Sequence, residues 1–225
     1  YYITSLGLWS VHFYYITSVT LCVEDGSNNF SWTGAAGDIQ KDSVYFIASV
    51  TKLYVTAVVM QLVEEGRIKL DDKISKYLTV DFIEWLHIYK GVDYSDEITI
   101  KHLISNTSGI PDYFFHKQDD GKTCASKLLE GNDGAWHLEK TLKLVKDLTP
   151  NFAPGKKGKA AYSDTNYQLL GRIIEIITGK DIGEVFQEFI FDKLNLKHTY
   201  TYKDSSDTRP VPFYYNSKKL WLHNY

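Results

Sequence analysis

One uninterrupted segment constrains the fold of this chain more than any other. Residues 49–65 contain neither glycine nor proline, and Leu53, Ala57 and Met60 recur at a helical spacing. Gly66 follows directly, as is typical of a helix C-terminus. The segment therefore predicts a long helix with Leu53, Ala57 and Met60 on its apolar face.

The elements before and after this helix differ in kind. Residues 14–23 and 30–34 are rich in β-branched and aromatic side chains around a polar turn, which predicts a hairpin. Residues 43–47 are expected to be extended, and the tail after Lys203 irregular. Four further helices are predicted: 99–105, 137–148, 165–178 and one from the cap Asp181 to about 194. Strands followed by a mainly helical region indicate an α+β fold rather than repeated βαβ units.

Composition and charge narrow the classes of function. The 225 residues carry a net charge of −3 and have a pI of about 6.2, which gives no reason to expect nucleic acid or a membrane surface as partner. Cys22 and Cys124 lie far apart and are expected as free thiols. The histidines show no spacing typical of a metal site, so no metal is expected. No stretch predicts a stable membrane span, and no signal peptide is evident.

Ser49 and Lys52 form the strongest local signal for chemistry. They lie at the start of the predicted long helix, so their side chains emerge on one face. A helix N-terminus favours an oxyanion near the serine, and a neighbouring neutral amine can be the base that a serine nucleophile needs. The alternative is that Ser49 only caps the helix while Lys52 points to water. The apolar lead-in and the unbroken helix favour the catalytic interpretation.

Four stretches, in the expected order, resemble one known family. They are FSWTGAAGDI, FIASVTKLYVTAVVMQLVEEGRIKLDDKISKYL, ITIKHLISNTSGIPDY and FAPGKKGKAAYSDTNYQLLGRIIEIITGK. Over residues 19–202 the chain resembles the serine β-lactamase-related family, especially class C β-lactamases, D-alanyl-D-alanine peptidases and allied esterases. The resemblance implies an α+β fold of the β-lactamase/transpeptidase type, with a helical region packed on an antiparallel sheet that is incomplete in this chain. It further implies a single domain over residues 1–225, with 1 to about 13 as an extension without an assigned element.

The resemblance also assigns a second motif. Tyr162-Ser163-Asp164 stands where the family has Tyr-x-Asn, which implies that Tyr162 lies over Ser49 and Lys52 as a proton relay. Taken without the resemblance, Tyr162 is better interpreted as a buried core tyrosine. An alternative register places Ser163-Asp164-Thr165 on the Ser-Asp-Asn motif of class A enzymes, but the flanking APG and TNYQLLG favour the tyrosine register.

Asp164, where the family has an amide, raises an electrostatic question. To act as a base near pH 7, Lys52 must lower its pKa by about 3, whereas a carboxylate within about 4 Å pushes that pKa upward. Either Asp164 points away, or Lys52 stays charged and Tyr162 takes the role of base. Asp164 and Asn166 are both predicted to support the site or to bind substrate.

The family closes its site with a strand that carries Lys-Thr-Gly or His-x-Gly, and neither tripeptide occurs in the sequence. Gly121-Lys122-Thr123 has a different order and is expected in a loop. Loss of one oxyanion donor costs roughly 100- to 1000-fold in rate, and an open sheet edge would need a partner chain to cover it. Two functions are therefore weighed: a serine hydrolase impaired by the lack of this motif, and a non-catalytic binding or regulatory homologue.

The presence of Ser49, Lys52 and Tyr162 favours the hydrolase. The resemblance implies acylation of Ser49 by an amide or ester, namely a β-lactam, a D-alanyl peptide or a small ester, followed by transfer to water. This chemistry needs no cofactor. The resemblance also implies a periplasmic or secreted location.

Overall fold

The structure is a computed structural model that describes residues 18–130, 136–203, 206–211, 213–215 and 218–220. These residues fall into two compact units. One unit contains residues 18–46 and the described part of 206–220, and the other contains residues 47–203. The prediction of one domain over residues 1–225 spans both units and stays a prediction.

The first unit is built on the hairpin of β1 (Ser18–Asp25) and β2 (Phe30–Gly37), which pair antiparallel. The Asp25 carboxylate closes the turn by accepting the backbone N–H of Ser27 at 3.0 Å and of Asn28 at 3.3 Å. This confirms the predicted hairpin within the described residues; its expected start at residues 14–17 lies outside them. The partner chain expected at an open sheet edge stays a prediction.

Two further strands belong to the same unit. β5 (Phe213–Tyr215) and β6 (Lys218–Leu220) pair antiparallel. The prediction of an irregular tail was therefore wrong in this part, because strands of three residues are too short to show a period in the sequence. The segment expected to be extended around Val44 forms a parallel bridge to Pro210.

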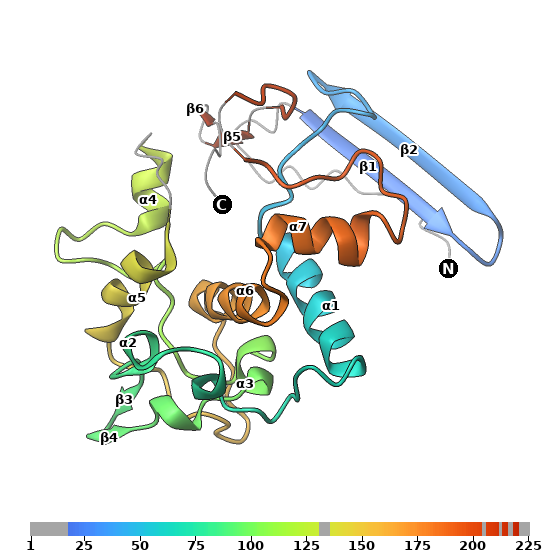
Figure 1. Cartoon of the computed structure of the whole chain (residues 1–225). Coiled ribbons are helices and arrows are strands. Elements are labelled where there is room, and N and C mark those ends of the chain that lie inside the picture. The colour runs from blue at the N-terminus through green and yellow to red at the C-terminus, as the bar shows by residue number, and fades with distance from the viewer. Residues whose placement is uncertain (1–17, 131–135, 204–205, 212, 216–217, 221–225) are drawn as a thin grey trace. The chain divides into compact units, whose positions relative to one another are not determined.

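The second unit contains the helices and one small strand pair (Figure 1). Its elements are η1 (Ala48–Val50), α1 (Thr51–Glu64), η2 (Ile74–Lys76), α2 (Val80–Ile83), β3 (Ile88–Tyr89), β4 (Val92–Asp93), η3 (Ser95–Glu97), α3 (Ile100–Ile104), α4 (Cys124–Leu129), α5 (Leu138–Lys146), α6 (Asp164–Thr178), α7 (Ile182–Phe186) and η4 (Gln187–Phe191). Helix α6 is central, since it contacts α1, α3, α5 and α7. Helices together with small antiparallel sheets make the fold α+β, as predicted.

The long predicted helix is confirmed as η1 and α1, but its predicted buried face was wrong. Within the unit, the buried side chains of α1 are Val55, Val58, Val59 and Leu62. Leu53, Ala57 and Met60 lie outside that face and are exposed. Valine and leucine occupy nearly every side of this helix, so the spacing of apolar residues does not select one face.

Local signals located the other helix ends well. The Thr99 hydroxyl caps α3 by accepting the N–H of His102 at 3.2 Å, and the Asp181 carboxylate caps α7 by accepting that of Gly183 at 2.8 Å. Gly179 ends α6 with a φ of 70°. The helix predicted from Asp181 to about 194 begins as α7 and continues as the π-helical turn η4, and α4 was not predicted.

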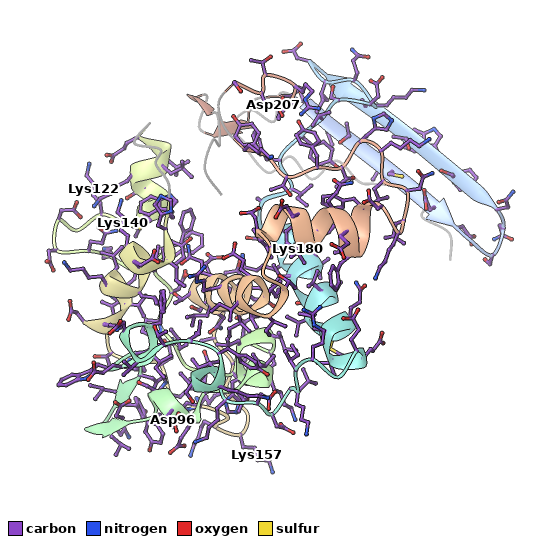
Figure 2. The ribbon with its side chains drawn as sticks, viewed as in Figure 1. Asp96, Lys122, Lys140, Lys157, Lys180 and Asp207 are labelled. Atoms are coloured by element: carbon purple, nitrogen blue, oxygen red, sulfur yellow. The ribbon has the colours of Figure 1, made fainter. Side chains whose placement is uncertain are left out.

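The surface of the helical unit is charged and solvated. The labelled Lys122, Lys140 and Lys157 project away from the ribbon (Figure 2). Lys157 belongs to the basic loop at residues 155–159, which is exposed along its length as a solvated loop would be. In the part of the chain that the structure describes, no helix combines the length and the apolar character needed to cross a bilayer.

Candidate active site

Ser49 lies in the turn of η1, just before α1, and its side chain does not cap the helix. The N-cap of α1 is Val50, and neither η1 nor α1 has a side-chain cap. Instead, Ser49 Oγ lies 3.0 Å from Tyr162 Oη and accepts a hydrogen bond from Lys52 Nζ at 3.2 Å. The hydroxyl is therefore oriented by two functional groups and remains exposed.

The backbone immediately before Ser49 is strained. Ala48 has a φ of 45°, a left-handed conformation that is unfavourable for a residue with a Cβ atom. Strain of this kind persists only where the surrounding structure enforces it, and it concentrates at functional sites. Ala48 thus turns the chain sharply as it enters the helix that carries Ser49 and Lys52.

Lys52 is the second residue of α1 and lies in a cage of one carboxylate and two aromatic rings. Its Nζ is 2.5 Å from Asp164 Oδ1, and it sits over the rings of Tyr162 and Tyr167 at 5.1 Å and 5.5 Å from their centroids. Its side chain is only 18% exposed. Burial lowers the pKa of Lys52, but its interactions with Asp164 and Tyr162 outweigh burial, so the net pKa lies above the ordinary value. Lys52 is therefore an ammonium ion near neutral pH.

Tyr162 is not the core tyrosine that the residues alone suggested. Its side chain is 48% exposed, and its hydroxyl donates to Asp164 Oδ1 at 3.0 Å while contacting Ser49. Ser163, the serine of the alternative register, is buried and donates to the carbonyl of Pro111 at 3.0 Å. The structure thus places the tyrosine of this motif, and not the serine, beside Ser49.

The structure brings Ser49, Lys52, Tyr162 and Asp164 together, whereas Asn166 lies behind them. Asn166 is fully buried. Its Oδ1 accepts from Ser108 Oγ at 2.7 Å, and its Nδ2 donates to Asn106 Oδ1 at 3.0 Å. Of its two predicted roles, the position of Asn166 fits support of the site.

Asp112 is a functional neighbour that the sequence did not reveal. Its Oδ1 accepts the backbone N–H of Asp164 at 3.0 Å, at a helix start that has no side-chain cap of its own. Burial first, and then the charge of Asp164, raise the pKa of Asp112 above its usual range. An aspartate directly after a proline, in a loop without a helix of its own to cap, was the only signal in the sequence.

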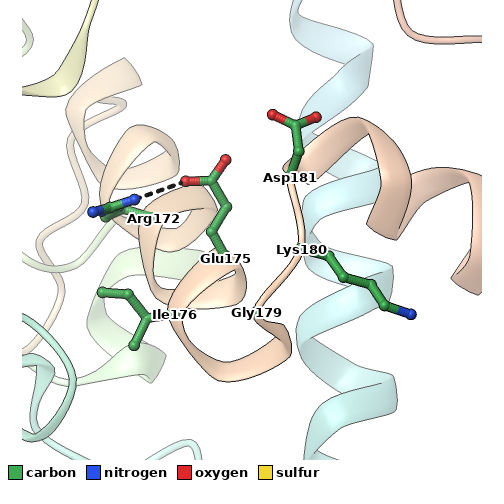
Figure 3. Close-up of a pocket in the computed structure, with 6 residues that line it drawn as sticks. All are labelled: Arg172, Glu175, Ile176, Gly179, Lys180 and Asp181. Atoms are coloured by element: carbon green, nitrogen blue, oxygen red, sulfur yellow. Dashed lines mark hydrogen bonds and ion pairs between the residues drawn. The ribbon is translucent and has the colours of Figure 1, made fainter.

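A pocket of about 310 Å³ lies at the opposite end of α6 (Figure 3). It is lined by Arg172, Glu175, Ile176, Gly179, Lys180 and Asp181. Arg172 and Glu175, which lie one turn apart on α6, pair with each other at 3.3 Å in its lining. None of the six lining residues is a serine, threonine or cysteine, in contrast to the start of α6.

Comparisons with known proteins bear on the family and the fold of the chain. The family model described as Beta-lactamase matches residues 18–223. A candidate D-alanyl-D-alanine carboxypeptidase of Escherichia coli (strain K12) is 32% identical over 158 residues, which are 70% of this chain and 33% of the relative. The chain thus spans about a third of the length of that curated relative.

Solved structures give the same fold. A D-stereospecific amidohydrolase from Streptomyces sp. aligns with a TM-score of 0.65 at 30% identity, over 80% of this chain and 50% of the other. A penicillin-binding protein from Bacillus halodurans aligns with a TM-score of 0.61 at 23% identity, over 84% of this chain and 54% of the other. The latter similarity concerns the fold alone.

Proposed function

The chain belongs to the beta-lactamase family, and from that premise we propose that it is a serine hydrolase in which an amide or ester acylates Ser49. One observation carries the proposal. Ser49 Oγ is hydrogen-bonded to both Tyr162 and Lys52, at 3.0 Å and 3.2 Å, and does not cap its helix. A serine with two such partners is oriented for nucleophilic attack, whereas a structural serine at this position would bond to the backbone.

The roles of the three groups follow from their hydrogen bonds. An ammonium ion can only donate, so Lys52 cannot take the proton of Ser49 while it is charged. Tyr162 is then the group that receives this proton, and Lys52 acts as a fixed positive charge beside the reacting atoms. This agrees with the raised pKa of Lys52 in its contact with Asp164.

The substrate is proposed to be a small molecule or peptide with an amide or ester bond. Two relatives in the comparison are named for hydrolysis of such bonds, a carboxypeptidase and an amidohydrolase. Tyr162 and Ser49 are both exposed, so a substrate carbonyl has access to them. A β-lactam, a D-alanyl peptide and a small ester all fit this description.

A second candidate function is a binding or regulatory homologue without turnover. One observation favours it: the Asp164 carboxylate holds Lys52 in its charged form. Such a homologue could retain Ser49 and Lys52 without completing acyl transfer.

Covalent labelling separates the two candidates. The protein is incubated with a fluorophosphonate or with penicillin, and the adduct is measured by intact mass and located by peptide mapping. We expect one adduct, on Ser49, that is lost in Ser49→Ala and kept in Ser105→Ala, an exposed serine that bonds only within its own loop. Labelling of another residue with Ser49→Ala fully reactive would contradict the assignment, and a folded protein without any adduct would favour the binding homologue.

A further inference from the structure

Ser49, Lys52, Tyr162 and Asp164 form a cluster, called here the Ser49 cluster. Its hydrogen bonds all run in one direction from donor to acceptor. The Tyr162 hydroxyl donates its single hydrogen to Asp164 Oδ1 at 3.0 Å, because a carboxylate can only accept. The 3.0 Å contact between Ser49 and Tyr162 must then have Ser49 as donor. Since Lys52 donates to Ser49, every hydrogen bond points along the path from Lys52 through Ser49 and Tyr162 to Asp164.

The carboxylate at the end of this path is held firmly. Asp164 is the first residue of α6, its side chain is 14% exposed, and its Oδ1 also receives Lys52 at 2.5 Å. Its backbone N–H is held by Asp112. An amide at this position could accept the hydrogen bond of Tyr162, but it could not take the proton itself.

We propose that Asp164 is the final proton acceptor during acylation, with Tyr162 as a relay between it and Ser49. As Ser49 Oγ forms its bond to the substrate carbonyl carbon, the Ser49 proton moves to Tyr162 Oη and the Tyr162 proton moves to Asp164. The substrate carbonyl oxygen becomes the oxyanion, Asp164 becomes a neutral carboxylic acid, and Lys52 remains an ammonium ion throughout. The oxyanion then re-forms the carbonyl as the bond from the carbonyl carbon to the leaving nitrogen or oxygen breaks, and Asp164 returns the proton through Tyr162 to that leaving atom.

This inference rests on the proposed hydrolase function and differs from direct attack assisted by a tyrosine anion. The relay needs no prior ionisation, because Tyr162 gains one proton as it loses another.

The charges around the cluster also favour the relay. Before the reaction, the positive charge of Lys52 is balanced by Asp164. Once Asp164 is neutral, Lys52 becomes an unbalanced positive charge beside the new oxyanion, which stabilises it. Burial, and then the charge of Asp164, raise the pKa of the nearby Asp112, so neutralising Asp164 also relieves the repulsion between the two carboxylates.

The substitution Asp164→Asn tests the relay, because the two mechanisms predict opposite signs. Without the carboxylate the relay has no final acceptor for the Ser49 proton, so the rate at which a fluorophosphonate phosphonylates Ser49, with loss of fluoride, should fall roughly 100-fold or more. If a tyrosine anion is the base, removal of a nearby negative charge makes that anion easier to form, and the rate should stay equal or rise. Asp181→Asn, which removes a helix-capping carboxylate near the far end of α6, is the matched control and should react at the wild-type rate.

A measurement on the unaltered protein gives a second test. The relay moves two protons in the same step, so the rate of Ser49 labelling in mixtures of H₂O and D₂O should fall along a curve as the fraction of D₂O rises. A straight-line dependence, as expected when a tyrosine anion takes a single proton, would overturn the relay. If the wild-type protein is not acylated at Ser49, the proposed function itself fails. If it is acylated and Asp164→Asn reacts as fast, only the relay fails.

Discussion

The two ends of helix α6 are built in different ways. At its start, the contacts come from a loop more than fifty residues earlier in the chain: Asp112 accepts the N–H of Asp164, and the carbonyl of Pro111 accepts the hydroxyls of Ser163 and Thr165. At its end, the capping contact is local, although Arg67 Nη2 also donates to the carbonyl of Ile177 in the last turn at 2.7 Å. Gly179 closes the helix with its N–H bonded to the carbonyl of Glu175 at 2.8 Å.

This difference shows where the unit can tolerate change. The end of α6 is exposed and behaves like many helix ends, with a glycine after the last turn and charged side chains around the last carbonyl groups. The start instead holds polar groups away from water, each with a specific partner that is distant in sequence. Such partners make the geometry around Ser49 dependent on the loop at residues 106–112, and three predictions test this contrast.

The largest effect is expected for Asn166→Ala at the start of α6. The change removes the buried acceptor of the Ser108 hydroxyl and one of the donors to Asn106 Oδ1, which should lower the free energy of unfolding by about 2–3 kcal/mol. Urea unfolding measures the loss. The matched variant at the other end is Thr178→Ala, whose hydroxyl bonds to nearby backbone groups, chiefly the carbonyl of Ile174 one turn earlier. It should cost about 1 kcal/mol or less, and equal losses at the two ends would remove the contrast.

An intermediate effect, dependent on pH, is expected for Asp112→Asn. Because the folded-state pKa of Asp112 is raised, mainly by burial, the folded protein binds this proton more tightly than the unfolded chain does. The ionised carboxylate therefore costs stability above its folded pKa, and the cost disappears below about 3.8, the ordinary value. Asparagine carries no such cost at any pH.

The stability of Asp112→Asn relative to wild type should thus be more favourable at pH 7 than at pH 3.5. Unfolding by urea at the two pH values measures this difference, and any constant effect of the lost hydrogen bond to the Phe115 N–H cancels from it. A difference that is independent of pH would mean that Asp112 is not a strained carboxylate. The exposed Asp181→Asn provides the comparison with an ordinary capping residue.

The same contrast explains which helix ends and which site residues could be predicted from the sequence. The close of α6 at Gly179 and the caps Thr99 and Asp181 were predictable, because their partners lie within four residues. The loop residues Asn106, Ser108 and Asp112 were not, because nothing in their own neighbourhood indicates a partner on α6. The proximity of Tyr162 to Ser49 was expected only through the family resemblance.

The elements of the fold also divide into those that the sequence predicts and those that it does not. The hairpin and the long helices follow from periodicity and turn residues, whereas α4, β5 and β6 are too short to show a period. The prediction of the buried face of α1 was wrong for a different reason. That helix is apolar on most sides, so only its neighbours α6 and α7 determine which valines are covered.

The smallest effect is expected for the ion pair of Arg172 and Glu175 at the far end of α6. The two groups are 3.3 Å apart with side chains 44% and 27% exposed, so water screens their attraction. A double-mutant cycle with Arg172→Ala and Glu175→Ala should give a coupling below about 0.5 kcal/mol that weakens in 1 M salt.

Glu175→Ala alone should cost more, because Glu175 Oε1 also accepts the N–H of Ile182 at the start of α7. The cycle removes that contribution, since the bond to Ile182 does not depend on Arg172. A coupling above about 1 kcal/mol that salt does not change would show that this end, too, is tightly organised, and the contrast with the start of α6 would then fail.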